Sequence, residues 1–255
     1  MRIKSSDPEP VTPLKPEYEY EHEAVLKTLD WTYCPDAIRE ARTKQDQILV
    51  ERFHGELYTI ADIGCGNGYH GALFAPSCRL YHGFEIVDKV ANIARTAWNA
   101  RRLSNTEVFV GDAGQAEPPP DFYDLVFCLY FTVGNFREQL EDLGLYTDPY
   151  LDQNPKFISV ISRFYMALKA SGSMLLTIYK DLPEAEESQI ELYRNTGQHV
   201  ITPRGSRFVA TAEGFWSVRW TEQSMLSNLR ACGIEGRDVL FHNLNRIAWL
   251  VEIRK

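Results

Sequence analysis

Short apolar runs that alternate with helix-length segments constrain the fold of this chain more than any other feature of its sequence. Between the runs, residues 68–74, 89–102 and 155–170 have the length and composition of helices. Strands that alternate with helices in this way predict a parallel sheet with helices on both faces. The five runs are residues 58–64, 81–88, 106–112, 123–133 and 173–180. Two further runs near the C-terminus are too close for a crossover helix, so we expect an antiparallel pair.

The segments outside this alternation predict three additions to the sheet. Residues 1–16 are proline-rich and are expected to form a flexible arm. Residues 17–55 read as two helices, opened by Pro16 and Pro35, which would form an N-terminal helical cap. Residues 181–218 contain a polar helix and two strand candidates, 198–202 and 207–212. We expect this insert to form a lid near the carboxyl ends of the strands, where open α/β sheets bind ligands.

Composition narrows the class of protein. The 255 residues are 44% apolar, which suffices for one large domain over residues 17–255. The net charge of −8 argues against a nucleic-acid partner, because phosphate backbones require a basic surface. Five scattered cysteines without a C-x-x-C pair suggest neither a metal site nor disulfides, which favours a cytoplasmic protein. No stretch approaches the roughly 20 apolar residues of a membrane span.

A glycine-rich loop follows the first predicted strand and precedes a helix. It reads Asp62-Ile-Gly64-Cys-Gly66-Asn-Gly68-Tyr69, so its spacing is G-x-G-x-G after an acidic residue. Tyr69 stands where the dinucleotide fingerprint G-x-G-x-x-G requires its third glycine. Glycines in such a loop let the backbone turn tightly and approach a ligand.

The loop D-I-G-C-G-N-G resembles the first motif of the class I S-adenosylmethionine-dependent methyltransferases. Three more features match that superfamily in order. Glu85 ends the second strand, Asp112 follows the third in V-G-D-A, and the fourth begins Y-D-L-V, like the family's F-D-L-V. The resemblance implies a Rossmann-like seven-stranded sheet of order 3-2-1-4-5-7-6, with the last strand antiparallel. It also implies S-adenosyl-L-methionine as the cofactor; a related fold that binds another ligand, or none, is the alternative.

The same resemblance implies roles for the cofactor-binding residues. An acid at the end of the second strand would accept both ribose hydroxyls, and a carboxylate is a natural acceptor for a diol. The acid after the third strand would accept from the adenine amino group. The implied set is Asp62 and the backbone of Gly64, Cys65 and Gly66 in the loop, Glu85 and Ile86, Asp112 and Ala113, and the main chain of Cys128 or Leu129 beside the sulfonium.

In small-molecule members of the superfamily, an arginine about 20 residues before the glycine loop grips the cofactor carboxylate, often with a tyrosine. Tyr33, Arg39 and Arg42 lie in that window, and we select Tyr33 and Arg42. A guanidinium suits this task because its paired donors match two carboxylate oxygens. The alternative is that these arginines are solvated on a helix surface.

The residues after the fourth strand point to the methyl acceptor. T-V-G-N-F is similar to T-I-G-N-F of histidine α-N-methyltransferases, in which the asparagine faces the amino-acid substrate, so Asn135 is a candidate acceptor ligand. Equally, Asn135 would cap a following helix. Phe131 replaces the asparagine of glycine-type N-methyltransferases, which argues against glycine-like acceptors. Tyr130 and His199 are the selected hydrogen-bonding or general-base candidates.

These residues predict a methyltransferase that acts on a small polar molecule, as a monomer or homodimer without nucleic-acid or membrane partners. N-methylation of an amine or amino acid is the first choice. O-methylation of a carboxylate or hydroxyl and a non-catalytic regulator that binds S-adenosylmethionine are the alternatives. An Arg204, Arg207 and His199 cluster facing the methyl group would favour an anionic acceptor, whereas a wall formed by residues 18–23 would favour an amine.

Overall fold

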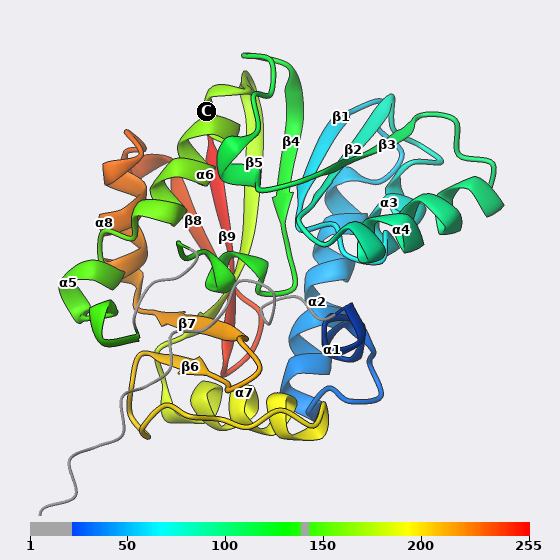
Figure 1. Ribbon diagram of the computed structural model, residues 1–255. Helices are drawn as coiled ribbons and strands as arrows, with labels where there is room; N and C mark the ends of the chain where they lie inside the picture. Colours follow the sequence, from blue (N-terminus) through cyan, green and yellow to red (C-terminus); the bar gives the residue numbers. More distant parts are fainter. Residues whose placement is uncertain (1–21, 139–142) are drawn as a thin grey trace, which may run out of the picture.

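The computed structural model describes residues 22–138 and 143–255 (Figure 1). Its strands are β1 (Thr59–Ile63), β2 (Leu80–Glu85), β3 (Thr106–Val110), β4 (Tyr123–Cys128), β5 (Leu168–Lys180), β6 (Phe208–Ala210), β7 (Trp216–Trp220), β8 (Val239–Asn243) and β9 (Ala248–Arg254). Its α-helices are α1 (His22–Leu29), α2 (Asp36–Phe53), α3 (Tyr69–Phe74), α4 (Asp88–Ala100), α5 (Asp148–Leu151), α6 (Pro155–Met166), α7 (Pro183–Asn195) and α8 (Glu222–Ala231). Short 3₁₀ turns are η2 (Ala113–Gln115), η3 (Thr132–Asn135), η4 (Leu143–Leu145) and η5 (Gly236–Asp238).

The main sheet has the order β3-β2-β1-β4-β5-β9-β8, and β1 to β5 are parallel. β9 runs antiparallel to β5, from the pair Ser173 and Arg254 to the pair Tyr179 and Ala248, and β8 runs antiparallel to β9. When β6 and β7 are left out and the other seven strands are renumbered in chain order, the sheet order is 3-2-1-4-5-7-6. The seventh strand, β9, is the antiparallel one. The expected Rossmann-like methyltransferase fold is confirmed.

Helices cover both faces of the sheet, because successive strand residues point to opposite sides. On one face, Val126 and Cys128 of β4 pack with apolar residues of α6 and α8. On the other face, Leu125 and Phe127 pack with apolar residues of α2, α3 and α4. The near-continuous burial of β1, β4 and β5 follows from this two-sided cover.

The segment after β5 forms α7 and the β6–β7 hairpin, which lie below the main sheet in Figure 1. β7 extends the sheet at the carboxyl end of β5, where Tyr179 pairs with Arg219. The strand predicted at 198–202 is wrong: it makes only an isolated bridge, Val200 to Thr211. β6 pairs with β7 instead, and all five residues of β7 are buried.

Two other boundaries also differ from expectation. The fourth strand ends at Cys128 rather than 133, because Tyr130 and Phe131 have φ angles of 51° and 69° that no strand accommodates. The helix predicted over 155–170 ends at Met166, since β5 begins at Leu168. Within the described ranges, no helix combines the length and apolar character that a membrane crossing requires.

Candidate active site

A cavity lies at the carboxyl ends of β1 to β5, between the helical cap and the β6–β7 hairpin. It encloses about 1350 Å³ of empty space, counting its open mouth. The strand ends supply one wall, α1 and α2 a second, and α7 with the hairpin a third. Ligand pockets of this fold class form at the same edge of the sheet.

The glycine loop forms the cavity floor through its backbone. Gly64 and Gly66 line the cavity, and Gly64, Gly66 and Gly68 have φ angles of 71°, 56° and 81°. The amide of Gly64 donates to the carbonyl of Phe84 at 2.7 Å, which ties the loop to β2. A side chain at Gly64 would collide with that of Thr132, so the close approach of η3 to the loop requires glycine there.

Glu85 lies in the cavity wall at the end of β2. Its carboxylate accepts from the amides of Gly66 at 2.9 Å and Val87 at 3.0 Å. Burial raises the pKa of Glu85, although these amide hydrogen bonds act in the opposite direction. The carboxylate is therefore fixed beside the loop, and Ile86 also lines the cavity.

Asp112 follows β3 and also lines the cavity, together with Ala113. One oxygen accepts from the amide of Gly114 at 2.8 Å, and the other forms an ion pair with the ammonium of Lys156. Lys156 lies in the first turn of α6, whose N-cap, Asn154, accepts the amide of Lys156 at 3.0 Å. Sequence reasoning missed Lys156, because no local motif marks it.

The side chains of four residues of the predicted cofactor set do not line the cavity, although for Cys65 and Cys128 the predicted contacts are through the main chain. Asp62 is buried and accepts a 2.6 Å hydrogen bond from the hydroxyl of Tyr81. Cys65 and Cys128 are buried, and Tyr33 lies between Trp31 and α2. The side chains of these predicted residues do not reach the cavity, so Asp62 orients the loop from behind through β2.

Of the two cap arginines, only Arg42 reaches the cavity. It is buried, and its guanidinium donates to the Sγ of Cys34 at 2.9 Å and the carbonyl of Thr28 at 3.1 Å. Its Nε atom is buried without a hydrogen-bond partner, and Arg42 forms no ion pair within the described residues. Arg39 instead pairs with Asp36 near the surface.

Tyr130 and Asn135, both predicted, line the cavity beyond β4. The Tyr130 hydroxyl donates to Asp46 of α2 at 2.6 Å. Asn135 ends η3, and residues 136–138 are not helical, so the expected capping of a helix there has no support in the described part of that segment. The remainder of that expected helix, residues 139–142, lies outside the described residues.

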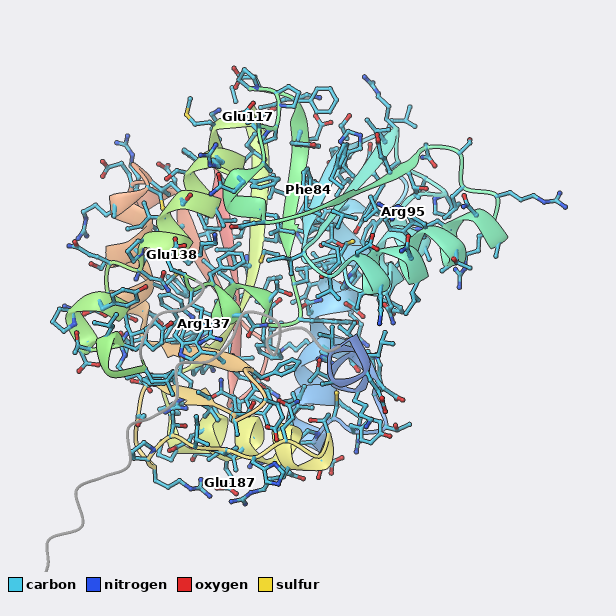
Figure 2. All side chains as sticks on the ribbon, in the orientation of Figure 1. Phe84, Arg95, Glu117, Arg137, Glu138 and Glu187 are labelled. Carbon is cyan, nitrogen blue, oxygen red and sulfur yellow. The ribbon has the colours of Figure 1, made fainter. Side chains whose placement is uncertain are left out.

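The wall opposite the glycine loop carries the buried guanidinium of Arg137 and aromatic side chains of α7 and β7. Arg137 donates to the carbonyl of Gly214 at 2.9 Å, which joins the segment after η3 to the hairpin (Figure 2). Tyr193 and Trp216 are buried beside it and line the same cavity. Sequence reasoning assigned no role to Arg137.

The basic cluster expected for an anionic acceptor does not face the cavity. His199 has an exposed side chain that lies 2.5 Å from a carboxylate oxygen of Glu213, so the structure gives it no place at the reacting atoms. Arg204 pairs with Glu187, which Figure 2 shows at the rim of the molecule, and Arg207 pairs with Asp152. Most of the acidic and tyrosine-rich wall, residues 18–21, lies outside the described residues.

Comparison with known proteins agrees with this geometry. Residues 60–143 match a family model described as "Methyltransferase domain". No curated protein matches the chain. The fold is similar to that of the PH0226 protein from Pyrococcus horikoshii, with a TM-score of 0.59, 18% identity, and coverage of 90% of this chain and 97% of that one.

Two further solved structures share the fold. A 1,6-didemethyltoxoflavin-N1-methyltransferase from Burkholderia thailandensis has a TM-score of 0.57 and 14% identity, covering 98% of this chain and 93% of its own. A magnesium protoporphyrin IX methyltransferase from Synechocystis has a TM-score of 0.57 and 15% identity, covering 94% and 97%. Both of those structures hold bound S-adenosylhomocysteine.

The sheet order and the strand-end site define a Rossmann-like transferase, and the family match covers the segment that carries the glycine loop and both acids. Residues 60–143 thus match a methyltransferase domain, and together with the sheet order they support an S-adenosylmethionine-dependent methyltransferase of class I.

Proposed function

We propose that this enzyme transfers the methyl group of S-adenosylmethionine to a small polar acceptor, with an amine or amino acid as the first choice. One observation carries the cofactor assignment: Glu85 and Asp112 stand at the ends of neighbouring parallel strands in one cavity wall. Glu85 would accept from the ribose hydroxyls and Asp112 from the adenine amino group.

Arg42 supports the assignment of the same cavity to the amino-acid half of the cofactor. A buried guanidinium without an ionic partner costs free energy, so a ligand carboxylate that reaches it would stabilise the complex. Arg42 lines the cavity with its Nε unpartnered within the described residues, and Gly64 and Gly66 line the floor nearby. The cavity thus offers acids to a nucleoside and a cation to an amino-acid carboxylate.

The acceptor assignment depends on the opposite wall. Arg204, Arg207 and His199 do not line the cavity, so the basic cluster that would favour an anionic acceptor, and with it O-methylation, does not stand there. Asn135 and the aromatic residues there suit a polar amine, since amides hydrogen-bond amines and aromatic faces attract cations. Arg137, in the same wall, favours a second candidate: O-methylation of a carboxylate oriented by its guanidinium.

For methyl transfer, the main task of the protein is to align the acceptor nucleophile with the methyl group. When bound, the sulfonium supplies an electrophilic methyl group. The side chains of this chain must hold the acceptor nucleophile about 3 Å away and in line, exclude water, and receive a proton if an amine reacts. Asn135 and Tyr130, on the segment after β4, are the residues we assign to the acceptor side of that alignment.

Titration with S-adenosylhomocysteine tests the cofactor assignment. We expect Glu85→Ala and Asp112→Ala each to weaken binding at least tenfold, because each removes one charged hydrogen-bond acceptor. Glu107→Ala, an exposed acid on β3, is the matched control and should bind like the wild type. Unchanged affinity in both cavity variants would remove the assigned binding mode.

Product analysis tests the acceptor. The enzyme is incubated with isotope-labelled S-adenosylmethionine and separate panels of amines, amino acids and carboxylic acids. Alkali-labile label indicates a methyl ester, whereas label that survives alkali on an acceptor without a hydroxyl group indicates N-methylation. Tight cofactor binding without turnover on any panel would instead support the non-catalytic regulator.

A further inference from the structure

A buried polar cluster lies behind Tyr130, between the helical cap and the sheet. Its centre is the carboxylate of Asp46 on α2, which accepts from the Tyr130 hydroxyl at 2.6 Å and from the Gln45 amide at 2.9 Å. The Nε2 of His70, on α3, lies 3.1 Å from the same carboxylate. Gln45, Asp46 and His70 are buried, so these contacts are shielded from solvent.

The same cluster holds the backbone of Tyr130 in an unusual conformation. The φ angle of Tyr130 is 51°, a region in which a bulky residue costs about 1–2 kcal/mol. The side-chain oxygen of Gln45 accepts the amide of Tyr130 at 3.3 Å and also the hydroxyl of Thr177 on β5. Side chains from α2 and β5 therefore stabilise the turn that ends β4.

The ring of Tyr130 connects this cluster to Arg42. The guanidinium carbon of Arg42 lies 4.7 Å from the ring centroid, within the range of a cation–π contact. The imidazole of His70 packs edge-on against the ring, at 4.6 Å. Since both Arg42 and Tyr130 line the cavity, any movement of the ring would displace the guanidinium.

We propose that Asp46, Gln45 and His70 are positioning residues that fix Tyr130, and through its ring Arg42, for the amino-acid half of the cofactor. The inference rests on the proposed function, because that assigns the cofactor carboxylate to Arg42. It goes further in placing a function on three buried side chains of α2 and α3 that do not line the cavity.

Comparing the binding of two ligands distinguishes a positioning role of these residues from a general role in stability. S-adenosylhomocysteine carries the amino-acid half, whereas 5′-methylthioadenosine carries only the nucleoside half. We expect Tyr130→Phe and Asp46→Ala each to weaken binding of S-adenosylhomocysteine about fivefold, the value of one hydrogen bond, and to leave binding of 5′-methylthioadenosine within about twofold. The double variant should lose no more than either single one, because both remove the same contact.

Arg52→Ala is the matched control. Arg52 lies in the last turn of the same helix and forms a bidentate ion pair with Glu252, remote from the cavity. It should lower the melting temperature without changing the ratio of the two affinities. Equal weakening of both ligands in the Tyr130 and Asp46 variants, additive losses, or no loss would overturn the inference. Failure of the wild type to bind either ligand would overturn the proposed function and this inference together.

Discussion

The ammonium of Lys156, at the start of α6, lies against the carboxylate of Asp112, which follows β3. Gly114 makes this contact feasible, because a side chain at that position would press on the Lys156 ammonium. A second carboxylate, Glu138, lies 3.9 Å from the same ammonium. The negative charge of Asp112, which we assign to the adenine amino group, is thus balanced by Lys156.

Lys156→Met should destabilise the cofactor-free enzyme, because it leaves Asp112 partly buried without its cation. We expect a loss of about 2 kcal/mol in the free energy of unfolding, measured by urea denaturation. Lys169→Met is the matched control: it breaks a more exposed pair with Asp124, at 2.8 Å, and should cost about 0.5 kcal/mol. Equal losses in both variants would contradict the assigned importance of the Lys156 pair.

Gly64→Ala should abolish cofactor binding. Alanine at a φ of 71° is strained by about 1–2 kcal/mol, and its methyl group would collide with Thr132. Gly55→Ala isolates the backbone strain, since Gly55 has a φ of 94° and nothing within 4 Å of an added Cβ. Calorimetric titration with S-adenosylhomocysteine should show intact affinity for Gly55→Ala alone; retained affinity in Gly64→Ala would refute the role of the loop.

Arg42→Met should weaken S-adenosylhomocysteine about tenfold, because it removes the buried cation that we assign to the ligand carboxylate. Binding of 5′-methylthioadenosine, which has no carboxylate, should remain within about twofold of the wild type. Arg39→Met, on the same helix but paired with Asp36 near the surface, should change neither affinity. A parallel loss of both ligands in Arg42→Met would argue against the assignment.

Glu252 should make stability depend on pH in the acid range. Burial alone would raise its pKa, but hydrogen bonds from Arg52, Arg254 and His242 outweigh burial and lower the pKa to about 2. A carboxylate with a depressed folded-state pKa contributes its full stabilisation above its unfolded-state pKa, about 4.3. That contribution is lost as pH falls from there through about 2.

The Glu252→Gln variant provides the comparison. It should be less stable at neutral pH by about 3 kcal/mol, because it leaves the arginines around it without their buried partner. The stability gap between the two proteins should narrow as the pH falls below about 4.3. Thermal melts across pH 2–7 would show this as converging curves; a gap that is constant with pH would rule out the titration of Glu252.

Local patterns were sufficient for part of this protein. The apolar runs, the glycine spacing and the acids Glu85 and Asp112 each lie within a few residues of the strand that displays them. Such patterns predict where a strand ends and which backbone approaches a ligand, because the geometry of a strand followed by a tight turn depends on neighbouring residues. The cavity at the strand ends was predictable on that basis, whereas the sheet order was predicted from the family resemblance that the same motifs carry.

The partners of those residues were decided by the tertiary structure. Lys156 reaches Asp112 across 44 positions, and Asp46 reaches Tyr130 across 84. His199, in contrast, was predicted as a hydrogen-bonding or general-base residue, yet its side chain lies exposed on the surface of the insert. Sequence determined which segments form strands, helices and the glycine loop; only the packing of α2 and α6 against the sheet decided which charged and polar side chains meet, because long-range contacts depend on the whole arrangement of elements rather than on local spacing.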